Sequence, residues 1–218
     1  MSSREDILGR IRARLGRNPD NAASTRAAID AYLAVPRQGP QPRVDGDLVA
    51  RFREKSEVQS STVEEVAAPA ELAPAIARYL SLYELPSQAV CWPELSGLAW
   101  REAGLDVESR GALGSDLVGI TGCFCAVAET GTLMLCSGPE TPAALSLLPE
   151  THIAIVPAAR IVSRMEDAWR LARADLPELP RAVNFISGPS RTGDIEQTIV
   201  LGAHGPYRVH IIIVRGAW

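Results

Sequence analysis

The strongest constraint on the fold is an alternation of short apolar runs and amphipathic segments that begins near Ser60. The apolar runs have the length and composition of strands: Ser61–Val66, Gln88–Trp92, Leu117–Thr121, Thr132–Cys136, His152–Val156, Ala182–Ile186 and Arg208–Val214. The segments with helical spacing are Ala70–Tyr83, Pro93–Ala103, Pro142–Leu148, Val162–Ala174 and Asp194–Leu201. This alternation predicts an α/β sheet with helices on both faces. Ligands of such sheets bind beyond the carboxyl ends of the strands, which directs attention to the loops after Thr121, Ile186 and Val200.

The first 58 residues follow a different pattern, which predicts a helical appendage. The first helix has Ile7, Leu8, Ile11 and Leu15 on one face. A second helix is expected over Thr25–Val35, followed by a linker rich in proline and glycine. A third helix is expected after Asp45 or Asp47. We therefore expect a helical appendage over residues 1–58 and the main domain over residues 59–218.

Charge and composition exclude several classes of protein. The chain of 218 residues is 46% hydrophobic and carries a net charge of −4. Weak net acidity argues against a broad nucleic-acid surface, which needs clustered positive charge. The charged N-terminal segment lacks the apolar core of a signal peptide, and no run is long enough to span a bilayer. We expect a soluble, cytoplasmic protein that has reduced thiols and no membrane span.

The four cysteines do not predict a metal site. No pair has the two-residue gap that is typical of zinc or iron–sulfur ligation. Cys123 and Cys125 would face the same side of a strand, and Cys136 follows nearby, so a metal site is conceivable. Small buried apolar residues are the favoured interpretation, because free cysteine is usually buried.

A first candidate site is the turn Glu129-Thr130-Gly131-Thr132. Gly131 allows a positive φ or a close backbone approach, and the threonines supply hydroxyls. Glu129 could act as a base, as a nucleophile or as a hydrogen-bond acceptor for a substrate hydroxyl. The alternative, which spacing alone favours, is a turn between two strands with a solvated glutamate.

A second candidate site lies between a predicted strand and a predicted helix. Its residues are Ser187, Gly188, Ser190, Arg191, Thr192 and Asp194. Free amides at a helix that begins near Asp194, together with the Ser190 and Thr192 hydroxyls, would bind an anion. Arg191 could hold a carboxylate or phosphate in a bidentate way. An ordinary strand-to-helix turn with a surface arginine is the alternative.

A third candidate is His204, which stands in the run Gly202-Ala203-His204-Gly205-Pro206 before the last apolar strand. A histidine in such a glycine-flanked loop could titrate near neutral pH and act as an acid or a base. A loop histidine without a role is the alternative. His152 and His210 lie within predicted strands, and we expect them to be structural.

These motifs together resemble a known family, the LUD domain. The resemblance is carried by AETGT, SLLP, GPSRTGDIE and HGP in that order, and it covers essentially the whole chain. The N-terminal run REDILGRIRARL is typical of the lactate utilization protein C branch. The resemblance implies a Rossmann-like three-layer α/β/α sheet of the NagB/RpiA/CoA transferase-like type, with residues 59–218 as the LUD domain.

The resemblance also implies a function, the oxidation of L-lactate to pyruvate together with iron–sulfur partner proteins. Glu129 and His204 are then the candidate catalytic residues, and the anion site would hold the small-molecule carboxylate. No GxGxxG fingerprint is present, so no cofactor is expected in this chain and the iron–sulfur clusters belong to the partners. Two alternatives stay open: an enzyme that acts on an acyl-CoA or phosphorylated molecule through Glu129, and a non-catalytic interaction subunit.

Overall fold

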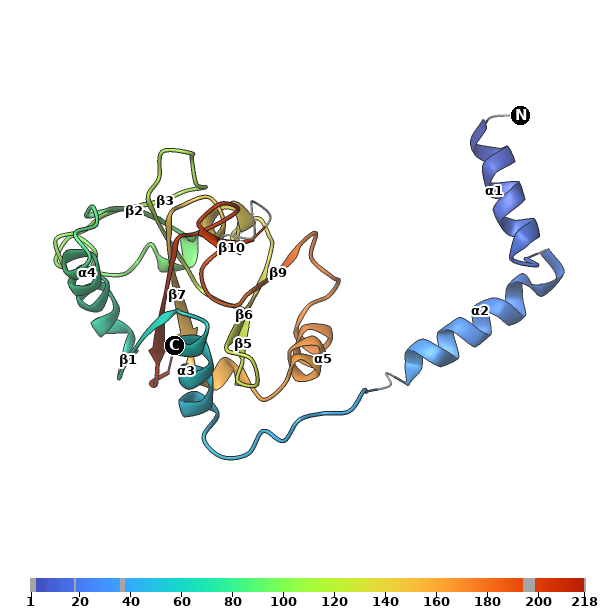
Figure 1. Ribbon diagram of the computed structural model, residues 1–218, viewed down its shortest axis with the longest axis horizontal. Coiled ribbons are helices and arrows are strands. Elements are labelled where there is room, and N and C mark those ends of the chain that lie inside the picture. Colours follow the sequence, from blue (N-terminus) through green and yellow to red (C-terminus); the bar gives the residue numbers. More distant parts are fainter. Residues whose placement is uncertain (1–2, 18, 36–37, 194–198, 218) are drawn as a thin grey trace. The chain divides into compact units, whose positions relative to one another are not determined.

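The computed structural model describes residues 3–17, 19–35, 38–193 and 199–217, and it divides into two compact units (Figure 1). The smaller unit covers Met1–Gln41 and the larger unit covers Pro42–Trp218. Within the described residues, no helix is both long enough and apolar enough to cross a membrane.

The smaller unit consists of helices α1 (Ser3–Arg14) and α2 (Pro19–Ala34). The second helix begins six residues before the predicted start at Thr25. None of the residues of α1 is buried, and the apolar side chains Ile7 and Ile11 are almost half exposed. The predicted apolar stripe is therefore present as an exposed surface.

The larger unit is built on a six-stranded parallel sheet. Its strands, in spatial order, are β1 (Thr62–Val66), β12 (Arg208–Val214), β7 (Thr151–Pro157), β4 (Val118–Thr121), β2 (Gln88–Cys91) and β3 (Asp106–Ser109). The sequence predicts all of these strands except β3, whose residues are mostly exposed at the edge of the sheet. In β7, Ile153 and Ile155 face one side, whereas Ala154 and Val156 face the other. Both faces of this strand are buried, as expected for a parallel sheet.

One face of the parallel sheet is covered by helix α4 (Leu72–Leu82), which follows the short 3-10 helix η1 (Pro69–Glu71). The helix predicted over Pro93–Ala103 is mostly wrong, because only the 3-10 turn η2 (Pro93–Leu95) forms there. The following residues make tight turns instead, and the Trp100 indole donates to the carbonyl of Leu95 at 3.0 Å. Both Leu95 and Trp100 thereby reach the core beneath the sheet.

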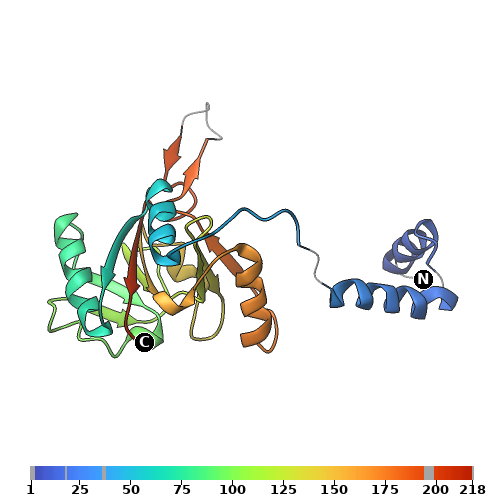
Figure 2. The same cartoon turned by 90° about the horizontal axis from the view of Figure 1, so that it is seen from below.

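The other face is covered by a second sheet, which corrects the prediction of helices on both faces. This four-stranded sheet has the order β8 (Ile161–Val162), β5 (Cys125–Val127), β6 (Thr132–Cys136) and β9 (Val183–Ile186). Helix α5 (Met165–Asp175) covers its outer side (Figures 1 and 2). Since β9 pairs antiparallel with β6, it does not belong to the parallel sheet.

Helix α3 (Leu48–Val58) packs within the larger unit. The Asp47 carboxylate caps it by accepting from the backbone amides of Val49 and Ala50, at 2.9 and 3.3 Å. Phe52 is fully buried against the layer between the two sheets. The two units therefore divide after Gln41, whereas the sequence predicts the division after residue 58.

The segment after β9 contains a small hairpin. Strand β10 (Arg191–Thr192) pairs antiparallel with β11 (Val200–Leu201). The predicted helix over Asp194–Leu201 is therefore wrong at its end, because Val200 and Leu201 are extended and paired. Residues 194–198, including Asp194, lie outside the described residues. The remaining elements are the 3-10 turns η3 (Ala143–Ser146) and η4 (Ala158–Arg160).

His152 and His210 are buried strand residues, in line with their expected structural role. His152 Nε2 and Thr121 Oγ1 share a hydrogen bond of 2.8 Å, and His210 Nδ1 and Thr62 Oγ1 share another of 2.8 Å. The His210 ring also stacks on Tyr79, with 3.9 Å between the centroids. Burial lowers the pKa of each imidazole to about 4, so both rings are neutral in the folded protein at neutral pH.

We predict that these histidines make the protein sensitive to mild acid. Between pH 6.5 and about 4, these histidines are protonated in the unfolded chain, whereas their buried rings stay neutral in the folded protein. The free energy of unfolding therefore falls as the pH falls. Each histidine contributes up to ~1.4 kcal/mol per pH unit. His152→Gln should flatten this dependence in urea unfolding across that pH range, whereas His204→Gln at an exposed loop should leave it unchanged. Equal slopes for both variants would contradict the prediction.

Candidate functional site

Several of the predicted site residues form one chain of hydroxyl groups. The tight turn between β5 and β6 is closed by the Gly131 amide, which donates to Val127 O at 3.0 Å. Within it, Thr130 Oγ1 and Thr132 Oγ1 are 2.7 Å apart, and Thr132 Oγ1 lies 2.7 Å from Ser187 Oγ. Thr132 is buried, whereas Thr130 and Ser187 are exposed. The structure thus brings the first and second predicted motifs into contact.

The predicted glycines serve a close backbone approach to the end of α3. Gly131 has a φ of +67°, and a Cβ at this position would overlap the backbone amide of Ser56. Gly188 has a φ of +82°, and a Cβ there would overlap the carbonyl of Gln59. The Ser56 hydroxyl also donates to Gly131 O at 3.3 Å. These glycines therefore hold the two loops against α3.

Arg191 also contacts the end of α3. Its Nη2 donates to Gln59 O at 3.1 Å and to the Ser60 hydroxyl. Arg191 is exposed, and its guanidinium has five N–H donors in all. The Arg191 guanidinium, which the sequence predicts to bind an anion, therefore uses one of its nitrogens to join β10 to the end of α3.

His204 is held close to Ser190. The His204 amide donates to Ser190 Oγ at 3.3 Å, and the Ser190 amide donates to Pro206 O at 2.9 Å. The His204 residue is exposed, and Glu129 is half-buried, with its backbone amide donating to Ser163 O at 3.0 Å. Among the described residues, no hydrogen bond or ion pair links the Glu129 carboxylate to Arg191 or His204. Their catalytic and anion-binding roles stay predictions, and Asp194 is outside the described residues.

This predicted cluster lies at the amino edge of the parallel sheet. Ser60 lies two residues before β1, and Pro206 lies two residues before β12. The carboxyl-end rule places the loops after Ile186 and Val200 at the opposite edge, which is wrong because their strands, β9 and β11, are not part of the parallel sheet. The loop after Thr121 does lie at the carboxyl edge.

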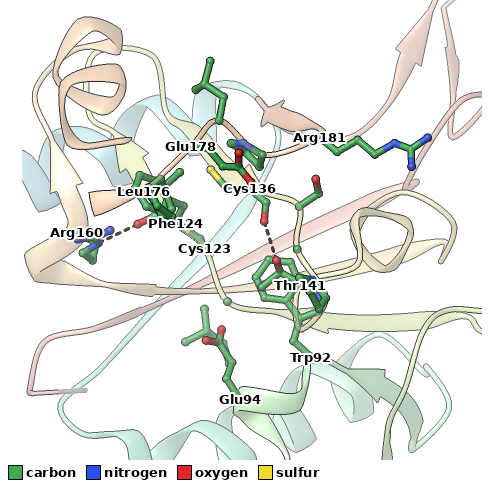
Figure 3. A pocket seen from close by; sticks show the side chains of 18 of the residues that line it. Trp92, Glu94, Cys123, Phe124, Cys136, Thr141, Arg160, Leu176, Glu178 and Arg181 are labelled. Carbon is green, nitrogen blue, oxygen red and sulfur yellow. Dashed lines mark hydrogen bonds between the residues drawn. The ribbon is translucent and has the colours of Figure 1, made fainter. Parts of the chain in front are cut away.

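At that carboxyl edge the structure contains a cavity of about 1010 Å³ (Figure 3). Trp92 and Glu94 come from the segment after β2, and Gly122 and Cys123 come from the segment after β4. The segment after α5 supplies a further wall that ends at Arg181. Chain segments that are distant in sequence therefore meet around one hollow.

Arg160 is anchored at the wall of this cavity. Its Nε donates to Phe124 O at 2.9 Å, and its Nη1 pairs with the Asp175 carboxylate at 2.8 Å. The guanidinium carbon lies 4.8 Å from the centroid of the Phe124 ring, within the range of a cation–π contact. The Glu94 carboxyl lies directly against Gly122, where any Cβ would overlap it. Desolvation raises the pKa of this carboxyl.

Three cysteines lie near the cavity, and they are held as thiols with raised pKa values. Cys123 and Cys136 line it, and burial raises the pKa of both. Cys125 is fully buried beside Met134, with 3.7 Å between the sulfur atoms, and desolvation raises its pKa to about 12. The packing role predicted for Cys125 is confirmed. Within the described residues, no group of His, Cys, Asp and Glu is arranged to hold a metal ion.

Sequence reasoning missed most of the cavity. Glu94 comes soon after the predicted strand that ends at Trp92, so the carboxyl-end rule could have identified it. No sequence pattern around Arg160 or Arg181 indicates a site. Only tertiary packing brings Arg160, at the end of η4, and Arg181, in the segment after α5, close to the end of β4. Trp92, the last residue of that predicted strand, is buried and also lines the cavity.

The cavity and the predicted cluster are separate sites. They lie at opposite ends of the β5–β6 hairpin, since the cluster contains Thr132 at its turn and the cavity contains Cys136 at its open end. Four residue steps along a strand cover about 13 Å. A three-carbon acid is too short to touch both.

Comparison with known proteins identifies the family. The family described as "LUD domain" matches residues 46–214. The chain belongs to the LUD domain family. The match begins two residues before α3, in agreement with the packing of this helix inside the larger unit.

Curated relatives share part of the chain. Lactate utilization protein C of Halalkalibacterium halodurans is 44% identical over 100 residues, which cover 44% of each chain. The protein of the same name from Bacillus subtilis is 42% identical over 100 residues, or 44% of this chain and 42% of the relative. The match therefore spans less than half the length of these relatives.

A solved structure covers more of the chain. The crystal structure of a DUF162 family protein from Deinococcus radiodurans has a TM-score of 0.56 and 27% identity. It covers 81% of this chain and 100% of its own. The likeness supports the α/β fold of the larger unit.

We predict that Gly131→Ala destabilises the larger unit by about 2–4 kcal/mol, because the residue has a positive φ and its Cβ would displace the end of α3. Gly111→Ala is the matched control, since a Cβ there meets no atom within 4 Å. Chemical denaturation of both variants measures the difference. Equal stabilities would show that the β5–β6 turn does not depend on this contact.

Proposed function

We propose that this chain acts in lactate utilization, assisting the oxidation of L-lactate to pyruvate together with iron–sulfur partner proteins. The observation that carries this proposal is the LUD domain match over residues 46–214, combined with relatives named Lactate utilization protein C. The NagB/RpiA/CoA transferase-like relationship and a cytoplasmic location belong to the same proposal.

The proposed chemistry removes two electrons and two protons from L-lactate. In this scheme Arg191 binds the carboxylate of lactate, since its guanidinium is partly open to solvent. Glu129 or His204 accepts the hydroxyl proton, and the hydroxyls of Thr130 and Ser187 orient the substrate. The C2 proton and the two electrons leave to a partner that carries the redox centre.

Growth of a deletion strain on L-lactate as sole carbon source tests the proposal. We expect the wild-type chain to restore growth, and Glu129→Gln and Arg191→Ala to restore at most about a tenth of the growth rate because each removes a reacting or binding group. Arg173→Ala, on the exposed side of α5, is the matched control and should restore growth fully. Circular dichroism checks that every variant folds.

Normal growth of the deletion strain, with no redundant system present, would overturn the lactate role. A covalent acyl group on Glu129, detected by mass spectrometry after incubation with an acyl-CoA, would favour the acyl-transfer alternative instead. Growth defects confined to unfolded variants would remove the support for the cluster as the site.

An interaction role has its own structural support. Ile7, Ile11, Leu15, Tyr32 and Leu33 of the helical unit all have exposed fractions above 40%. Exposed apolar side chains on helices favour docking against another protein surface. This observation is compatible with a subunit that brings the LUD domain to its partners.

Deletion of residues 1–41 separates the two roles of the helical unit. We expect the shortened chain to keep its unfolding midpoint and to lose growth on L-lactate, because the exposed stripe is removed while the core of the larger unit is kept. Thermal unfolding and growth are measured on the same variant. Full growth would exclude a required docking role, and a lowered midpoint would show that the stripe stabilises the chain's own LUD domain.

A further inference from the structure

The cavity at the carboxyl edge lies where the chain leaves neighbouring strands in opposite directions. After β2 the chain runs to the α4 side, because Leu95 packs in the core beneath α4. After the adjacent strand β4 it runs to the other side, because Cys123 and Ala126 pack between the two sheets. Such a divergence opens a crevice at the ends of the strands, and ligands of open α/β sheets bind there.

The walls of the cavity combine apolar and cationic groups. Figure 3 shows Trp92 and Glu94 on one side and Phe124, Leu176 and Cys136 across from them. Arg181 is exposed at the wall that follows α5. Aromatic and aliphatic walls with few polar groups are typical of sites for organic molecules.

The two arginines at the cavity differ in whether a carboxylate neutralises them. Arg160 is partly neutralised by Asp175, with 2.8 Å between Nη1 and the carboxylate. Arg181 has no such ion pair among the described residues. The two acidic residues at the wall differ in position, since Glu94 lies against Gly122 whereas Glu178 is exposed. An anionic group is therefore best placed near Arg181, with an apolar body between Trp92 and Phe124.

Size excludes lactate as the natural occupant. A cavity of about 1010 Å³ lies at the upper end of the range that encloses drug-sized ligands. A three-carbon acid would leave most of the apolar wall in contact with water, so burial would contribute little to its binding. The occupant needs an apolar or aromatic body in addition to its charge.

We propose that this cavity is a second ligand site, distinct from the proposed lactate cluster, which binds an amphipathic organic anion with an aromatic or long apolar body. The anion interacts with Arg181, and the body fills the space between the β2 and β5–β6 sides. Neither the family match nor the names of the relatives assigns such a site.

The test uses the full chain and the fluorescent probe 8-anilinonaphthalene-1-sulfonate, which has an aromatic body and one sulfonate. The probe also binds exposed apolar helices. Protection of the cavity cysteines from alkylation therefore shows whether it binds in the cavity. We expect the bound probe to slow iodoacetamide alkylation of Cys136 and Cys123 at alkaline pH by about fivefold or more, as followed by peptide mass spectrometry. This factor corresponds to occupancy of about 80% or more.

Charge is tested by Arg181→Glu against the matched control Arg173→Glu on exposed α5. Arg181→Glu should raise the probe concentration needed for half-maximal protection about two- to fivefold, as expected for one exposed ion pair, and Arg173→Glu should leave it unchanged. The neutral probe N-phenyl-1-naphthylamine should protect the thiols less than the sulfonate does.

Three outcomes would overturn the proposal: no protection of Cys136 or Cys123, equal effects of the two arginine variants, or equal protection by the neutral probe. Displacement of the probe by millimolar L-lactate would overturn the size argument and make the cavity the lactate site. These binding results do not depend on growth, so failure here is distinguishable from failure of the proposed lactate role.

Discussion

The apolar layer between the two sheets is the interaction on which the rest of the larger unit depends. Ala126, Leu133 and Leu135 of the second sheet pack against Ala154 and Ile211 of the parallel sheet. The opposite faces of the same strands pack against α4 or α5, so the central strands are buried on both sides. Helix α3, with its fully buried phenylalanine, completes this layer. The hydrophobic effect therefore fixes the position of the second sheet on the first.

The position of the β5–β6 hairpin in that layer determines what lies at each edge of the sheet. Its turn, with Gly131, reaches the end of α3 at the amino edge. Its open end, with Cys123 and Cys136, reaches the carboxyl edge and lines the cavity. One packed hairpin thus separates the hydroxyl cluster from the cavity.

The helical unit differs from the larger unit in how much of its apolar surface is buried. Its helices bury little surface of their own, and its apolar residues, such as Ile11 and Leu33, remain exposed. The family match begins at residue 46 and leaves this unit outside. The part of the chain that matches the family is accordingly the two-sheet core together with α3. The preceding helices form a separate unit with exposed apolar side chains.

The sequence by itself determined most strands and the family. Periodicity and burial of short apolar runs are local properties, so β1, β2, β4, β6, β7 and β12 could be predicted from them. The motif order AETGT, GPSRTGDIE and HGP likewise indicated the LUD domain, which the family match confirms. The hydrogen bond between Thr132 and Ser187 could not be predicted in this way, because it joins two motifs that are 55 residues apart.

Tertiary structure alone decided which sheet each strand joins. An apolar run such as Val183–Ile186 fits a parallel or an antiparallel sheet equally well, because its partner strand is not encoded in its own residues. That choice moved the second predicted motif to the amino edge and left the cavity at the carboxyl edge. Arg160 and Arg181 reach that cavity only through long-range packing, which a local sequence pattern does not predict.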